Sequence, residues 1–130
     1  MQNEANNLSE RLLEFGANIV RLTAKLNKTA VGRHIGSQLM RSATSCGANY
    51  EEACAGESKA DFVHKMQVVL KELRESLYWL KLVKRADLVL DDGLQPLLNE
   101  ADELVKIFAK SIITAKGQQT QWLKAENQGR

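Results

Sequence analysis

Two helical patterns follow one another between Ile35 and Leu90, and they constrain the fold more than any other feature of the chain. The first is rich in small residues and reads SATSCGANYEEACAG, whereas the second is a long amphipathic run, KADFVHKMQVVLKELRESLYWLKLVKR. Gly56 can end the first helix, and Ser58 can cap the next, with Asp61 three residues later. Because small side chains let a neighbouring helix approach closely, these patterns predict a tightly packed helical hairpin.

One further helix is expected on each side of this hairpin, because apolar residues recur there every three or four positions. The four predicted helices span about residues 8–26, 33–54, 59–86 and 94–117. Short connections favour antiparallel neighbours, so the sequence predicts an all-α, antiparallel up-down-up-down four-helix bundle. Gly117 is expected to end the last helix. Residues 1–117 then form the single domain, and residues 118–130 form a polar C-terminal tail.

Composition agrees with a helical core and leaves the partner open. Aromatic residues make up only 5% of the chain, against 44% hydrophobic residues in all, so aliphatic side chains must fill the core. The formal net charge of +2 is far from the one-sided excess of a dedicated nucleic-acid clamp. No apolar run approaches the roughly 18 residues of a membrane span. The polar start MQNEANNLSERLLEF is not expected to be a signal or transit peptide, so we expect a cytoplasmic protein.

The predicted helix over residues 59–86 is apolar on two sides. Its core-facing stripe contains Phe62, Val63, Met66, Val69, Leu70, Leu73, Leu77 and Leu80. A second apolar row projects away from this stripe, and an outward row that includes a Trp is expected to meet another subunit. The predicted subunit interface comprises Val68, Glu75, Trp79, Leu82 and Ala86. The alternative is that Trp79 lies flat on its own helix or under the C-terminal tail.

No set of side chains predicts catalysis or metal binding. Asp61 and His64 are one turn apart, but a di-iron carboxylate bundle needs about four carboxylates and two histidines pointing into the core. Cys46 and Cys54 lack CxxC spacing, so two buried, reduced thiols are expected, and Cys46 has no evident general base. The sequence therefore predicts no catalytic residue, no metal and no cofactor. A metal-dependent bundle enzyme is the alternative from the enzyme class.

The central motifs resemble those of a known family. They comprise Arg41-Ser42-Ala43, Asn49, Glu51-Glu52-Ala53, Ser58, Asp61-Phe62, Lys71-Glu72, Glu75 and Tyr78-Trp79-Leu80. This set resembles the core signature of small bacterial four-helix-bundle proteins first noticed as open reading frames in intervening sequences of large-subunit ribosomal RNA genes. The resemblance covers the chain from about Leu12 to Phe108. Such proteins are similar to the accessory variability proteins of diversity-generating retroelements, which partner a reverse transcriptase and bind nucleic acid.

The resemblance implies a homopentameric ring of four-helix bundles without enzyme activity. The expected function is that of a non-enzymatic, oligomeric scaffold or adaptor whose specific role is unknown. The alternative is an accessory protein that binds RNA, DNA or a reverse transcriptase. Its candidate nucleic-acid contacts are Arg33, Arg41, Lys59 and Lys65, near or before the Gly56 turn, where ring symmetry would multiply a modest charge. The neighbouring carboxylates of Glu51, Glu52 and Asp61 oppose this alternative.

Overall fold

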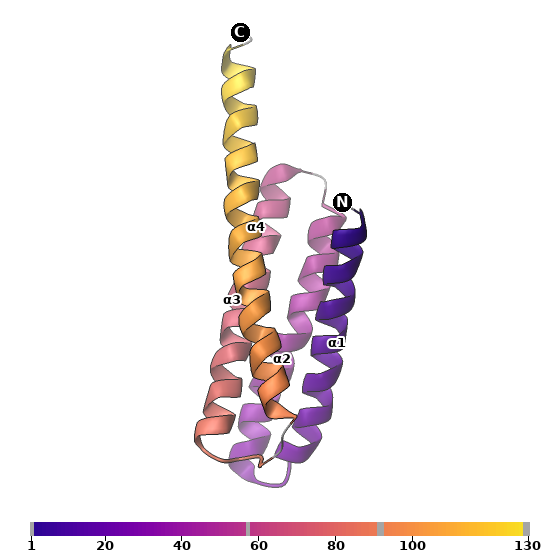
Figure 1. Cartoon of the computed structure of the whole chain (residues 1–130), viewed down its shortest axis with the longest axis vertical. Coiled ribbons are helices and arrows are strands. Elements are labelled where there is room, and N and C mark those ends of the chain that lie inside the picture. The colour runs from indigo at the N-terminus through magenta and orange to yellow at the C-terminus, as the bar shows by residue number, and fades with distance from the viewer. Residues whose placement is uncertain (1, 57, 91–92, 129–130) are drawn as a thin grey trace.

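The computed structural model describes residues 2–56, 58–90 and 93–128, and all regular structure in these ranges is helical. Its four helices are α1 (Gln2–Leu26), α2 (Ala30–Cys54), α3 (Lys59–Arg85) and α4 (Leu94–Gln128). Figure 1 shows these helices side by side, with the C-terminal part of α4 extending beyond the other three. The prediction of an all-α chain with four helices is therefore confirmed for the part of the chain that the structure describes.

Side-chain caps set the starts of the two central helices. The hydroxyl of Ser58 accepts a hydrogen bond from the backbone N–H of Asp61 at 3.1 Å, which confirms the predicted cap of α3. Thr29 caps α2 in the same way, since its hydroxyl accepts from the backbone N–H of Gly32 at 3.0 Å. This second cap was not predicted, and it moves the start of α2 back to Ala30. Each cap satisfies a backbone N–H that the helix leaves unpaired, and is worth about 1 kcal/mol.

The C-terminal helix does not end where the sequence predicted. We expected Gly117 to end it, but α4 continues through Gly117 to Gln128, so the segment predicted as a polar tail is helical over residues 118–128. A glycine stops a helix most effectively in the left-handed conformation, and no glycine in the described ranges has a positive φ. Inside a helix, glycine costs only about 1 kcal/mol relative to alanine, which the good helix formers around it can offset.

One hydrophobic core runs through the bundle, and the predicted apolar stripes build it. Its most deeply buried large apolar side chains are Leu12, Phe15 and Ile19 of α1, Leu39 of α2, Val69, Leu73, Leu80 and Val83 of α3, and Leu104 and Phe108 of α4. The rings of Tyr50 and Phe108 meet edge to face, with their centroids 5.5 Å apart. In α3, Phe62, Leu70 and Leu77 are only half-buried and lie at the margin of the core.

The helices pack in the order of the chain. α2 packs closely on both α1 and α3, and α3 also packs on α4, whereas α1 has few contacts with α4. Small residues of α2 bring it near α1, because a Cβ added to Gly36 would lie 3.6 Å from the Cβ of Leu26. A Cβ added to Gly47 would likewise lie 3.8 Å from that of Leu12. The glycines of α2 are therefore packing residues, as the sequence indicated.

Candidate interaction surfaces

The residues of the central motif contact one another along the seam between α2 and α3. Arg41 of α2 lies 3.3 Å from the carboxylate of Glu72 and also forms an ion pair with Glu75, both on α3. Glu75 in turn accepts a hydrogen bond of 3.4 Å from the indole N–H of Trp79. The Glu72 side chain is only 13% exposed, so water screens its charge less than that of a surface carboxylate. The motif therefore joins two helices within one subunit.

Two buried serines lie beside this ion-pair network. The hydroxyl oxygens of Ser42 and Ser76 are 2.8 Å apart, and each is also within hydrogen-bond distance of a backbone carbonyl about one turn earlier. Among the residues that the structure describes, every buried side-chain nitrogen and oxygen has a hydrogen-bond partner. The buried polar side chains of the described residues therefore all form hydrogen bonds within the protein.

The two cysteines differ in environment, and the prediction that both are buried is wrong for Cys54. Cys46 is fully buried, whereas Cys54 is exposed because it is the last residue of α2. Burial raises the pKa of the Cys46 thiol to about 12, and the carboxylates of Glu72 and Glu75 act in the same direction. Its Sγ donates to the carbonyl of Ser42 at 3.2 Å. A thiol that stays protonated is a poor nucleophile, so Cys46 acts as a core side chain.

No group of three or more His, Cys, Asp or Glu side chains lies close enough to share a metal ion within the described ranges. Asp61 and His64, the pair considered from the sequence, are both exposed on α3. In the same described part of the chain, no helix has an apolar stretch long enough to cross a bilayer.

The row of α3 residues predicted as a subunit interface is partly covered by its own bundle. Its members are Val68, Glu75, Trp79, Leu82 and Ala86. Trp79 and Leu82 pack against the core of their own subunit, and Glu75 is paired with Arg41. Next to this row, Tyr78 is 58% exposed and its ring meets that of Trp79 edge to face at 5.3 Å. The assignment of this row to a subunit contact stays a prediction.

Two of the predicted nucleic-acid contacts, Lys59 and Lys65, lie near the connection between α2 and α3. The Nζ of Lys65 is 2.5 Å from a carboxylate oxygen of Glu52. The Nζ of Lys59 donates to the side-chain oxygen of Gln118 at 3.2 Å and lies 5.9 Å from the centre of the Phe62 ring. A phosphate at this site would have to compete with the Glu52 carboxylate for Lys65.

The other two predicted contacts, Arg33 and Arg41, lie on α2, away from the connection to α3. Arg33 is in the first turn of the helix, at the opposite end from Lys59, and donates to the backbone carbonyl of Asn27 at 3.3 Å. Arg41 lies near the middle and is held by the carboxylates of α3. The structure therefore does not bring the four predicted residues together into one basic cluster.

A surface that the sequence analysis missed lies on the outer side of α1 and α2. Leu13 and Val20 of α1 are 67% and 46% exposed. They border a groove of about 530 Å³, whose other lining residues include Glu10, Gly16 and Ala17 of α1, and Thr44, Gly47, Ala48 and Glu51 of α2. The signal was present in the sequence, because Leu13, Ala17 and Val20 recur at helical spacing on a face separate from the core stripe.

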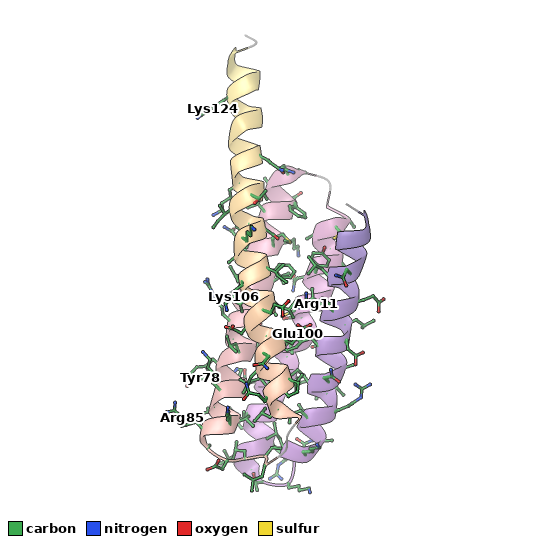
Figure 2. All side chains as sticks on the ribbon, in the orientation of Figure 1. Arg11, Tyr78, Arg85, Glu100, Lys106 and Lys124 are labelled. Carbon is green, nitrogen blue, oxygen red and sulfur yellow. The ribbon has the colours of Figure 1, made fainter. Side chains whose placement is uncertain are left out.

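Basic residues line a groove on the opposite side of the bundle. This groove of about 420 Å³ runs between α3 and α4, and its lining includes Leu70, Lys71 and Arg74 of α3, and Ile112, Ile113 and Lys116 of α4. Ile113 is 73% exposed. Figure 2 shows Tyr78, Arg85 and Lys106 on this side of the molecule, whereas Arg11 and Glu100 face each other between α1 and α4. In that pair a guanidinium nitrogen lies 2.6 Å from a carboxylate oxygen.

Known proteins resemble this chain over nearly the whole bundle. The model of the 23S rRNA-intervening sequence protein family matches residues 4–110. A solved structure of a protein of unknown function from the S23 ribosomal protein family of Bacteroides thetaiotaomicron matches with a TM-score of 0.76 and 33% sequence identity. That match covers 83% of this chain and 96% of the Bacteroides chain. No match is found among curated proteins.

Proposed function

The chain belongs to the 23S rRNA-intervening sequence protein family, and from that premise we propose that it is a non-enzymatic scaffold or adaptor that assembles into a homopentameric ring. The observation that carries this proposal is the apolar groove on the outer side of α1 and α2, where Leu13 and Val20 are exposed. Contiguous apolar surface of this kind is typical of protein–protein contacts. The number of five subunits comes from the family resemblance.

The proposed subunit is an antiparallel up-down-up-down bundle, and side-chain contacts support this course of the chain. The relevant pairs are Ser42–Ser76 and Glu52–Lys65 between α2 and α3, and Lys59–Gln118 and Lys84–Gln95 between α3 and α4. Within each pair of helices, the residue number of one partner falls as that of the other rises. This relation is expected of neighbours that run in opposite directions.

The buried residues that the structure describes support a structural role rather than a catalytic one. The buried serines Ser42 and Ser76 bond to each other, and the Cys46 thiol is held protonated by its burial. Catalytic groups more often have pKa values shifted toward neutral pH and lie in a cleft. We therefore assign the function of this protein to its outer surfaces.

The experiment for this proposal is native mass spectrometry together with light scattering over a range of protein concentrations. We expect a single closed species of five 14.5-kDa chains. A closed ring has no free interface to extend, so its mass should not grow with concentration. A protein that remains monomeric at every concentration would contradict the proposed ring.

Nucleic-acid binding is the second candidate function, and the cations of α3 favour it. Lys71, Arg74, Lys81 and Arg85 are exposed and, among the described residues, have no carboxylate within ion-pair distance. Unlike Arg41, they can contact a phosphate without first leaving an internal partner. Binding through such residues should be weak, tolerant of sequence and steeply dependent on salt, because each phosphate contact releases counterions.

Fluorescence anisotropy with labelled RNA and duplex DNA tests this second function. The variant Lys81→Gln/Arg85→Gln should bind more weakly and reduce the slope of log affinity against log salt by roughly two. The matched control is Arg41→Gln, which removes a cation that is already paired within the subunit and should leave the slope unchanged. Absence of binding even at about 50 mM salt would eliminate nucleic acid as the partner.

A further inference from the structure

We propose that the groove on α1 and α2 of one subunit receives the α3–α4 side of a second copy of this chain. We call the first surface the acidic groove, defined by Glu10, Leu13, Val20 and Glu51. The second surface is the rim of the groove between α3 and α4, which we call the basic ridge and define by Lys71, Arg74 and Ile113. This inference rests on the proposed ring, and it names the two different surfaces that build each subunit contact.

The two surfaces carry opposite charges that their own subunit does not neutralise. Glu10 and Glu51 are exposed, and no Lys or Arg of the described ranges lies within ion-pair distance of either carboxylate. Lys71 and Arg74 are exposed and equally without an acidic partner in that part of the chain. Glu52, by comparison, already pairs with Lys65. Complementary charge of this kind steers association and excludes wrong pairings.

The α2 part of the acidic groove and the α3 part of the basic ridge lie at the same height on opposite sides of the bundle. The contacts Ser42–Ser76 and Glu52–Lys65 mark the two ends of a segment in which α2 and α3 lie side by side. The α2 wall of the acidic groove and the α3 part of the basic ridge both fall between these two contacts in the chain. Because the helices pack in chain order, the α1–α2 side faces away from the α3–α4 side.

This placement suits a ring whose axis runs parallel to the helices. Neighbours in such a ring are related by a rotation alone, so surfaces at equal height on opposite sides meet without any shift along the axis. A contact between two different surfaces of the same chain closes into a ring when the rotation between neighbours adds up to a full turn, whereas a contact between two identical surfaces stops at a dimer.

One apolar side chain at the rim of the α3–α4 groove could also fill part of the acidic groove. Ile113 is 73% exposed, so it can insert into a neighbouring surface. The acidic groove has small residues along its length, and a Cβ added to Gly16 would meet nothing within 4 Å. Burial of Ile113 against Leu13 of the next subunit would remove apolar surface of both copies from water.

Charge reversal tests the proposal. The groove-reversed variant is Glu10→Lys/Glu51→Lys, and the ridge-reversed variant is Lys71→Glu/Arg74→Glu. Each should be monomeric at a concentration where the wild type is a ring, because like charges then face each other across every contact. Combining all four substitutions in one chain should restore the wild-type mass. Circular dichroism should show unchanged helical content, since all four side chains are exposed.

A mixture of the two double variants gives the sharpest result. Each variant can bind only the other, so the two kinds of subunit must alternate around a ring. Alternation cannot close a ring of five, so equimolar mixing should give one-to-one assemblies with even numbers of chains in native mass spectrometry. The matched control is Lys81→Glu/Arg85→Glu, which makes the same change of charge on α3 beyond the basic ridge and should keep the wild-type ring.

The outcomes separate this inference from the proposed function. A monomeric wild type overturns the ring and this inference with it. A wild-type ring that persists in both double variants leaves the ring standing and overturns the groove–ridge contact. A ridge-reversed variant that keeps the ring but loses RNA binding also overturns it, because the ridge would then be a nucleic-acid surface.

Discussion

At the level of single residues, the hydroxyls of Ser42 and Ser76 show how this core tolerates polar atoms. Burying a hydroxyl without a partner costs free energy, but these two lie 2.8 Å apart and each also reaches a backbone carbonyl of its own helix. The pair therefore links α2 to α3 at a fixed position along both helices.

We predict that Ser42→Ala and Ser76→Ala each lower the free energy of unfolding by about 1 kcal/mol, because each removes one shared hydrogen bond. The double variant should lose less than the two single losses together, by about 0.5 kcal/mol or more, since the shared bond can be lost only once. Urea denaturation of the four proteins measures this coupling. Strictly additive losses would show that the two hydroxyls do not interact.

Cys46 makes stability depend on pH in the alkaline range. Burial raises the pKa of its thiol from the ordinary value of 9.0 to about 12, so the folded state favours the protonated form. The stabilisation is fully present below about pH 9 and is lost as the pH rises toward 12. We therefore predict that the free energy of unfolding falls more steeply between pH 9 and 11 in the wild type than in Cys46→Ala.

The comparison with Cys46→Ala isolates the thiol, because the pKa of Tyr50 is also raised by burial and contributes equally to both proteins. Chemical denaturation at each pH provides the measurement. If the two proteins lose stability in parallel across this range, the alkaline loss does not come from Cys46.

At the level of the helix, α4 extends beyond Gly117, the residue that was predicted to end it. Gly117 lies inside it, and a Cβ added there would meet nothing within 4 Å. Gly117→Ala should therefore stabilise the helical segment 118–128 by about 1 kcal/mol, which corresponds to roughly fivefold slower amide hydrogen exchange in that segment.

A second glycine provides the contrast for this prediction. Gly32 lies in the first turn of α2, and a Cβ added there would collide with the backbone carbonyl of Leu26. Gly32→Ala should therefore lower the melting temperature of the whole protein. If exchange over residues 118–128 is unchanged in Gly117→Ala, the end of α4 is not limited by its own helix propensity.

At the level of the whole molecule, the outward side of α3 carries two neighbouring candidate contacts. The row that includes Trp79 borders α2 through the ion pair of Glu75 with Arg41, whereas the basic ridge borders α4. We predict that Trp79→Glu dissociates the ring, because it replaces the largest apolar side chain of the predicted interface row with a charged one. Native mass spectrometry gives the mass of the variant, and circular dichroism its helical content.

Thermal unfolding must accompany this experiment, because Trp79 also packs against the core of its own subunit. Loss of the ring with intact helical content would assign the row to the subunit contact. An unchanged ring with a lower melting temperature would assign Trp79 to its own bundle and would leave the groove–ridge contact untouched.

The sequence by itself determined the helices and the core of this protein. The 3.6-residue period of the apolar stripes predicted all four helices, and Ser58 with Asp61 predicted the start of α3, because these signals act between residues close together in the chain. The family resemblance also followed from sequence motifs within α2 and α3.

Only the tertiary structure decided which charges and apolar rows remain available to a partner. Arg41 and Lys65 are predicted nucleic-acid contacts, and only the packing of α2 on α3 shows that they are paired with Glu75 and Glu52. The exposure of Leu13 and the open sides of Lys71 and Arg74 likewise depend on which helix faces meet. Helical periodicity is local, whereas the neighbours of a surface side chain come from helices far away in the sequence, so their pairing follows only from the packed bundle.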